Sequence, residues 1–228
     1  MTVKHIGLVL DGNRRFARKH GLPLYKGHEK GAENIKNLIG WAKELGVEEL
    51  TLYSFSMQNF NRAKEEVGYL FKLAERFFMK ILNAIKNGTD KVLQFVRFNF
   101  IGRLHLFPKK IQDLIKKLIL RTKNNKGVKV NFAFGYGGRE EIIDAVNKAI
   151  KKGVRKVSEK TISENLYLQS EPEIIIRTGG EQRTSNFLPW QSVYSELFFI
   201  KKTWPEFNKN DLKKILSQFN SRERRFGV

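Results

Sequence analysis

A chain of 228 residues can bury the core of one ordinary domain, and the absence of cysteine excludes disulfide bonds and thiolate metal sites. The 43 Lys and Arg against 23 Asp and Glu give a net charge of +20, which favours anionic partners such as nucleic acid, an acidic membrane surface or diphosphates. No stretch approaches the roughly 18 apolar residues of a membrane span, and the apolar run before Asp11 is too short for the core of a signal peptide. We therefore expect a single cytoplasmic domain over residues 1–228.

Strand and helix patterns alternate along the chain. Short apolar, β-branched runs predict strands over 6–10, 49–55, 96–101, 128–134, 173–176 and 197–200. Helical spacing predicts a helix that begins at Phe16 and further helices over 28–45, 64–87, 108–122, 139–151 and 209–220. The alternation is typical of an α/β fold, in which helices flank a mostly parallel central sheet and ligands bind at the carboxyl ends of the strands.

The first predicted strand ends at Asp11, and Gly12 and Asn13 form the turn into the first helix. A helix N-terminus offers free N–H groups that can hold a phosphate, and a carboxylate beside a phosphate is a typical Mg²⁺ environment. Taken alone, the Asp-Gly-Asn sequence is better explained as an ordinary turn in which Asp11 caps the helix.

A second anion-binding pattern lies between Ile174 and Glu196. The β-branched run 174–176 ends directly at Arg177, and two glycines, Arg183 and Ser185 follow. Arginine offers paired donors to phosphate oxygens, and glycine lets backbone N–H groups approach an anion closely. A surface turn would explain the glycines, but it would not place Arg177 at the end of a buried strand, where α/β proteins bind ligands.

Several motifs together resemble a known family. They are HIGLVLDGNRRFARKHG, the Gly27-His28 pair, LTLYSFSMQNFNR, YGGR at 136–139, IIIRTGGEQRTSNFLPWQ and the ending RERRFG. In order and spacing they resemble the cis-prenyltransferases, the group that includes undecaprenyl diphosphate synthase and dehydrodolichyl diphosphate synthase, over residues 4–227. The wording of residues 102–108 leans toward the archaeal branch of that family.

The resemblance implies an enzyme that condenses isopentenyl diphosphate onto an allylic prenyl diphosphate with a new cis double bond. The expected product is a long-chain cis-polyprenyl diphosphate, a precursor of glycosyl-carrier lipids. Mg²⁺ would bind Asp11, with Glu196 as a second acidic group. The other implied roles are allylic diphosphate binding by Gly12, Arg14, Arg15 and Arg62, isopentenyl diphosphate binding by Arg177, Arg183 and Ser185, and catalysis with proton handling by Asn13, His28, Ser56 and Asn59.

The resemblance also implies how the chain assembles and where its product goes. Arg225 and Gly227 near the end of the chain would reach the partner's active site in a homodimer. The hydrocarbon would grow into a tunnel between sheet and helices and leave through peripheral contact with a membrane. An apolar stripe in the helix over 64–87, otherwise most simply core, would form one wall: Leu70, Leu73, Ala74, Phe77, Ile81, Ala84 and Ile85. Other expected walls are Leu52, Ser54, Val128, Val130 and Phe132, with Phe71 and Phe78 nearby.

Three positions depart from the family pattern, namely Leu24, Gln58 and Gln182, where the family usually has Arg, Glu and His. Two other functions compete with the enzyme. One is a non-catalytic scaffold subunit of a hetero-oligomeric prenyltransferase, which would lack the metal Asp and the phosphate arginines. The other is a basic nucleic-acid-binding protein, which would need a recognition helix or aromatic reader motif that is not found in the sequence, so we expect no nucleic acid as a partner.

Overall fold

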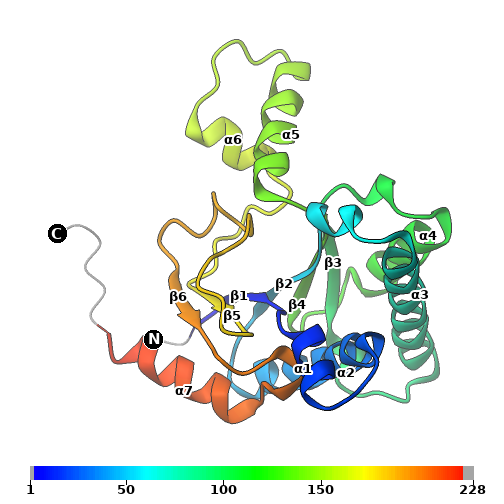
Figure 1. Cartoon of the computed structure of the whole chain (residues 1–228). Coiled ribbons are helices and arrows are strands. Elements are labelled where there is room, and N and C mark those ends of the chain that lie inside the picture. Colours follow the sequence, from blue (N-terminus) through cyan, green and yellow to red (C-terminus); the bar gives the residue numbers. More distant parts are fainter. Residues whose placement is uncertain (1–2, 223–228) are drawn as a thin grey trace.

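The computed structural model describes residues 3–222 (Figure 1). The strands are β1 (His5–Val9), β2 (Glu49–Ser56), β3 (Arg97–Ile101), β4 (Lys129–Tyr136), β5 (Ile174–Arg177) and β6 (Glu196–Phe199). The α-helices are α1 (Asn13–Lys19), α2 (Leu24–Glu44), α3 (Lys64–Asn87), α4 (Lys109–Thr122), α5 (Gly138–Lys151), α6 (Glu159–Asn165) and α7 (Lys209–Asn220). Short 3₁₀ helices are η1 (Met57–Asn61), η2 (Leu93–Phe95), η3 (Leu104–Leu106) and η4 (Trp204–Glu206).

The strands form one sheet in the order β3-β4-β2-β1-β5-β6, and each neighbouring pair is parallel. The predicted α/β fold with a parallel sheet is therefore confirmed. All residues of β1 and β5 are buried, as expected for parallel strands covered on both faces. In the register of the sheet, Val9 lies opposite both Tyr53 and Arg177, so the carboxyl ends of β1, β2 and β5 meet at one edge.

Helix α3 packs on the sheet less closely than α2. Only Phe78 and Ile81 of its 24 residues are buried, whereas α2 buries Ile35, Leu38 and Ile39 among others. The difference leaves apolar cavities beside α3, described below. Of the other predicted tunnel walls, Leu52, Val128 and Val130 are instead packed in the solid core, with at most 7% of their surface exposed.

Some helix boundaries differ from those predicted, and local chemistry explains them. Helix α2 begins at Leu24 rather than at 28, because Pro23 precedes it with the backbone φ of −55° that proline favours before a helix. Helix α1 begins at Asn13 rather than Phe16, since Gly12 adopts a left-handed φ of 100° and turns the chain directly from β1 into the helix. Helix α6 was not predicted, although the Ser158 hydroxyl caps it by accepting a hydrogen bond from the backbone N–H of Thr161.

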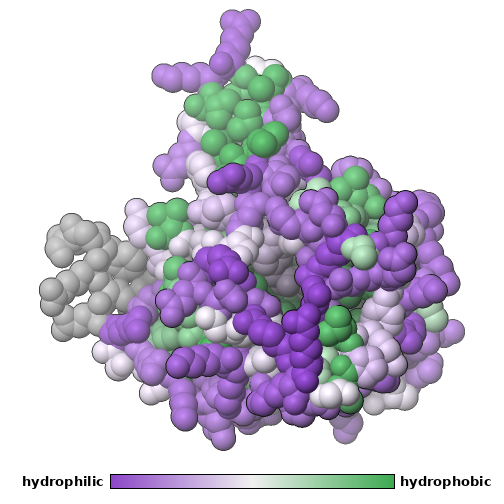
Figure 2. Space-filling model, in the orientation of Figure 1, coloured by the Kyte–Doolittle hydropathy of each residue, from purple (hydrophilic) through white to green (hydrophobic). Residues whose placement is uncertain are grey.

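Helices α5 and α6 project from the rest of the molecule (Figure 1). Hydrophobic residues gather on this projection (Figure 2), where Ile143 and Ile150 of α5 are more than half exposed. Within residues 3–222, no helix is long and apolar enough to cross a membrane.

Candidate active site

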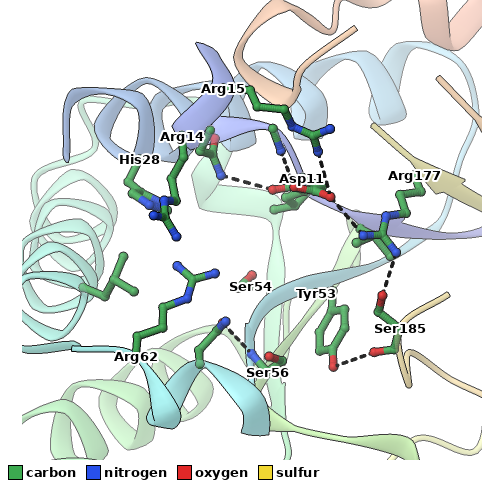
Figure 3. Close-up of a pocket in the computed structure, with 16 residues that line it drawn as sticks. Asp11, Arg14, Arg15, His28, Tyr53, Ser54, Ser56, Arg62, Arg177 and Ser185 are labelled. Carbon is green, nitrogen blue, oxygen red and sulfur yellow. Dashed lines mark hydrogen bonds and ion pairs between the residues drawn. The ribbon is translucent and has the colours of Figure 1, made fainter. Parts of the chain in front are cut away.

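A pocket of about 420 Å³ opens where β1, β2 and β5 end (Figure 3). We call it the anion pocket because most of its polar lining is cationic or donates hydrogen bonds. It brings together most of the predicted site residues. Its lining consists of Val9, Leu10, Asp11, Gly12, Asn13, Arg14, Arg15, His28, Tyr53, Ser54, Ser56, Asn59, Arg62, Leu70, Arg177 and Ser185.

Asp11 follows the end of β1 and is the only acidic residue in that lining. One carboxylate oxygen accepts a hydrogen bond from the Gly12 N–H at 2.6 Å. The other receives Arg177 Nη2 at 2.9 Å and Arg15 Nη2 at 3.1 Å. Burial alone would raise the pKa of Asp11, but the hydrogen bonds from Arg177 and Gly12 and the charge of Arg15 lower it below its usual value. The side chain is therefore a carboxylate at neutral pH.

Arg177 is held rigidly at the end of β5. It is 6% exposed, and besides Asp11 it donates through Nη1 to Ser185 Oγ at 2.7 Å and to the backbone carbonyl of Arg183. Thr178, the next residue, donates its hydroxyl to the Asp11 carbonyl at 2.8 Å and so ties the two strand ends together. Asp11 and Arg177, which the sequence predicted as two separate anion-binding features, are thus joined by a direct hydrogen bond.

The other arginines of the site also meet carboxylates. Glu66, in the first turn of α3, accepts from Arg62 Nη1 at 2.9 Å, and Arg14 Nη1 lies 3.9 Å from the same oxygen. Glu181 lies 3.3 Å from Arg15 and 2.7 Å from Arg183. The Arg183 side chain is 63% exposed and does not line the anion pocket, although its backbone carbonyl contacts Arg177.

His28 and Asn13 present unpaired polar atoms to the pocket. Among the described residues, neither His28 Nε2 nor Asn13 Oδ1 has a hydrogen-bond partner, although both atoms are buried. Because such atoms are normally satisfied, they indicate a place for a ligand or water. Burial, helped by the charge of Arg62, lowers the pKa of His28 to about 4, so its imidazole is neutral at pH 7.

Ser56 and Asn59 line the pocket but also have a local structural role. The Asn59 Oδ1 accepts from the backbone N–H of Ser56 at 2.9 Å, and the Ser56 side chain accepts from the Asn59 backbone, which forms a capping box on η1. This short helix carries the chain to Arg62. Tyr53 and Ser54 also line the pocket, and neither was predicted to do so at its polar end. Their place at the carboxyl end of the strand next to β1 was the available signal.

Glu196 does not join Asp11 within this chain. It lies at the start of β6 opposite Ile174, whereas Arg177 lies opposite Phe199 at the other end of the strand. Three residues of strand separate these levels by roughly 10 Å. The Glu196 carboxylate instead pairs with Arg222 at 2.7 Å. The two carboxylates are thus apart within one chain, and the role of Glu196 as a second acidic group for Mg²⁺ stays a prediction. The predicted Arg225 and Gly227 lie outside the described residues.

The three departures from the family pattern are peripheral. Leu24, Gln58 and Gln182 are all exposed, and none lines the anion pocket. Lys26, the basic residue two positions after Leu24, pairs with Glu29 at 2.9 Å. It does not line the pocket either.

A divalent cation bound together with a phosphate ligand fits this arrangement. Within residues 3–222, no group of three or more His, Asp and Glu side chains is placed to hold a metal alone. Mg²⁺ commonly binds through one or two carboxylates together with phosphate oxygens. The ionised Asp11 carboxylate, in a pocket lined by arginines, supplies the protein part of such a site.

Two further cavities continue from the anion pocket along α3. An inner cavity of about 110 Å³ shares six lining residues with it, namely Leu10, Asn13, His28, Tyr53, Ser54 and Leu70, and is otherwise lined mainly by Phe, Leu and Ala side chains. A side groove of about 440 Å³ between α2 and α3 shares Ala32, Leu73 and Phe77 with the inner cavity. A polar site thus adjoins a mostly apolar inner cavity, and the side groove next to it combines apolar side chains of α3 with charged ones such as Lys36 and Arg76.

Sequence comparisons place this geometry among enzymes of one kind. Residues 9–227 match the family model described as "Putative undecaprenyl diphosphate synthase". An isoprenyl transferase of Fusobacterium nucleatum is 43% identical over 225 residues, which cover 98% of this chain and 95% of the relative. A geranylgeranyl-diphosphate-specific tritrans,polycis-undecaprenyl-diphosphate synthase of Methanopyrus kandleri is also 43% identical, over 98% of this chain and 84% of the relative. Bacterial and archaeal relatives match equally well, so membership of the archaeal branch stays a prediction.

Two solved structures are similar over almost the whole chain. Lavandulyl diphosphate synthase from Lavandula x intermedia, in complex with dimethylallyl diphosphate, superposes with a TM-score of 0.92 at 34% identity, covering 100% of this chain and 99% of that one. A probable undecaprenyl diphosphate synthase from Campylobacter jejuni superposes with a TM-score of 0.84 at 30% identity, covering 99% of each chain.

Proposed function

The chain belongs to the cis-prenyltransferase family, and we propose that its anion pocket condenses isopentenyl diphosphate with an allylic prenyl diphosphate. The protein is a transferase of prenyl groups. We further propose that repeated condensation yields a long-chain cis-polyprenyl diphosphate of the glycosyl-carrier type. The observation that carries the proposal is the juxtaposition of the Asp11 carboxylate, several arginines and an adjoining, mostly apolar inner cavity.

We assign the allylic diphosphate to the side of the pocket formed by α1 and η1. Arg14, Arg15 and Arg62 line it, and Gly12 opens the turn where the first N–H groups of α1 begin. A side chain at position 12 would meet Thr203 at 2.8 Å, besides being strained at φ 100°. When bound, Mg²⁺ would neutralise phosphate charge as a Lewis acid, with Asp11 as its protein ligand.

We assign the isopentenyl diphosphate to Arg177, Ser185 and Arg183. Arg177 is fixed at the strand end, whereas Arg183 is exposed and is held by Glu181. A rotation of the Arg183 side chain away from Glu181 would add its donors to the same phosphate. The buried arginine then orients the substrate while the exposed one closes over it.

The chemical step breaks the allylic C1–O bond and joins C1 to the terminal methylene of isopentenyl diphosphate. The π electrons of isopentenyl diphosphate form the new bond, and pyrophosphate leaves with the electrons of the C–O bond. One proton then leaves C2 of the isopentenyl unit, and its C–H electrons form the new C2=C3 cis double bond. His28 Nε2 and the departing pyrophosphate are the two candidate acceptors of that proton. The neutral imidazole has no competing partner among the described residues, and the charge of bound diphosphates would raise its pKa from about 4. Asn13, Ser56 and Asn59 would orient the reacting groups around it.

We place the growing hydrocarbon in the inner cavity and then in the side groove. Leu70, Leu73, Ala74 and Phe77 of the predicted stripe line the inner cavity. Phe77 lines both spaces, as do Ala32 and Leu73, so these three residues mark the junction. An apolar chain passing there is removed from water, which favours elongation by about 0.8 kcal/mol for each buried CH₂ group.

We propose a homodimer that covers the exposed apolar side chains near β6 and on α5. Strand β6 is at the edge of the sheet, and Leu197 on it and Val193 before it are 43% and 69% exposed. Ile143 and Ile150 on α5 are exposed as well, and burial of these apolar side chains against a second copy would favour association. The net charge of +20 would also favour peripheral contact with an anionic membrane when product leaves. Light scattering measures the dimer, and vesicle sedimentation measures the membrane contact.

Incorporation of radiolabelled isopentenyl diphosphate into extractable lipid by the purified chain tests the function. Label in lipid that requires both Mg²⁺ and an allylic diphosphate supports the proposal. No incorporation by the chain alone, with recovery on adding a second subunit, would support the scaffold function instead.

A further inference from the structure

Two arginines of the anion pocket meet on a carboxylate that lies outside the pocket lining. Arg14 comes from α1 and Arg62 from the turn after η1, yet both guanidinium groups approach Glu66 Oε1, at 3.9 and 2.9 Å. Glu66 itself does not line the pocket. It therefore contacts two residues of the lining without belonging to the lining itself.

The contact also brings together two separate elements. Arg14 and Arg62 carry like charges and would repel each other across the mouth of the pocket in the absence of an anion. Neither is buried, since their side chains are 42% and 30% exposed, so burial alone does not fix them. A carboxylate between them offsets the repulsion and limits the number of side-chain conformations.

The simpler explanation is that Glu66 only stabilises its helix. Acidic residues in a first turn interact favourably with the helix dipole, and α3 has two of them, Glu65 and Glu66. Glu65 alone places a negative charge at the start of the helix. It is exposed and has no ion pair or hydrogen bond among the described residues. The helix thus does not need Glu66 to turn toward two arginines.

We propose that Glu66 is a positioning residue. It fixes the guanidinium groups of Arg14 and Arg62 relative to each other, so that both can bind the allylic diphosphate. The inference rests on the proposed function, because it takes these arginines as allylic ligands. It acts on one substrate only, since Arg177 and Ser185 lie on the other side of Asp11 (Figure 3). In the described part of the chain, Arg177 pairs with Asp11 and Ser185 and has no ion pair with Glu66.

Steady-state kinetics of Glu66→Gln, with Glu65→Gln as the matched control, test the proposal. Loss of the charge is expected to raise the KM for the allylic diphosphate roughly 3–10-fold. This is the effect of losing an ion pair whose free energy is at most that of one charge-assisted hydrogen bond. The KM for isopentenyl diphosphate, the melting temperature and the Glu65→Gln values should stay near wild type. Glu66→Ala, which lacks the amide as well, should show a larger increase.

Calorimetric titration of inorganic pyrophosphate gives a readout independent of turnover. Weaker binding by Glu66→Gln that disappears in an Arg62→Ala background is the expected result, because the carboxylate acts through that arginine. Unchanged or tighter binding would overturn the proposal, and tighter binding would make Glu66 a competing anion. Wild-type protein that neither binds pyrophosphate nor incorporates label would instead contradict the proposed function.

Discussion

The two arginines assigned to isopentenyl diphosphate differ in burial, and this difference yields a sharp prediction. Arg177→Ala removes the 2.9 Å ion pair to Asp11 and the bonds to Ser185 Oγ and the Arg183 carbonyl. Asp11 would keep Arg15 and the Gly12 N–H, and its side chain is 32% exposed, so the remaining charge is only partly uncompensated. We expect the free energy of unfolding to fall by about 2–4 kcal/mol.

Arg183→Ala is the matched control. Its side chain is 63% exposed and, among residues 3–222, pairs only with Glu181, so its removal should cost less than about 1 kcal/mol of stability. Each variant loses charge-assisted hydrogen bonds to the substrate worth about 1.5–3 kcal/mol, which corresponds to a rise of roughly 10–150-fold in the KM for isopentenyl diphosphate. Urea unfolding and initial rates measure the two quantities. Equal loss of stability in both variants, or an unchanged KM in either, would refute the reasoning.

Three further predictions follow from the same pocket. Asp11→Ala should lower turnover roughly 100-fold or more while circular dichroism stays native, because a methyl group cannot ligate Mg²⁺; wild-type turnover would remove the assignment. Ala74→Leu narrows the inner cavity, so thin-layer chromatography should show shorter products, whereas Phe77→Ala should lengthen them. Unchanged product lengths, with a fall of about 3–5 kcal/mol in the free energy of unfolding of Phe77→Ala, would mean that these side chains of α3 are solid core. His28 has a folded pKa of about 4 against 6.5, so the unfolded state binds its proton first and wild-type stability should fall by up to roughly 3 kcal/mol between pH 6.5 and 4. That part of the acid dependence should be missing in His28→Gln, and identical pH profiles of unfolding would contradict the pKa assignment.

The sequence predicted the centre of the site because its position depends on backbone topology. Asp11 and Arg177 each follow an apolar run, and the carboxyl ends of parallel neighbours must share an edge, which the Val9–Arg177 register confirms. The same topology explains why Glu196 lies away from Asp11 within this chain. An acidic residue that begins a strand lies at the opposite edge, and the motif that suggested it did not say where β6 starts.

Side-chain pairing across elements was beyond prediction. Glu66 and Glu181 are ordinary surface carboxylates by sequence, and only the fold brings each of them against two arginines. The cavities along α3 were anticipated as a tunnel from the helical stripe. Of the other predicted walls, Ser54 and Phe132 line the inner cavity. Leu52, Val128 and Val130 are buried in the core, and periodicity alone does not distinguish core from cavity wall.

The most direct measurement of the central claim is the amount of pyrophosphate released per isopentenyl unit joined. The purified chain, an allylic diphosphate, labelled isopentenyl diphosphate and Mg²⁺ are incubated together, and both products are counted. Condensation in the anion pocket predicts one pyrophosphate for each labelled unit found in lipid, with both lost together in Asp11→Ala. Pyrophosphate released without labelled lipid, or labelled lipid formed at the wild-type rate by Asp11→Ala, would contradict it.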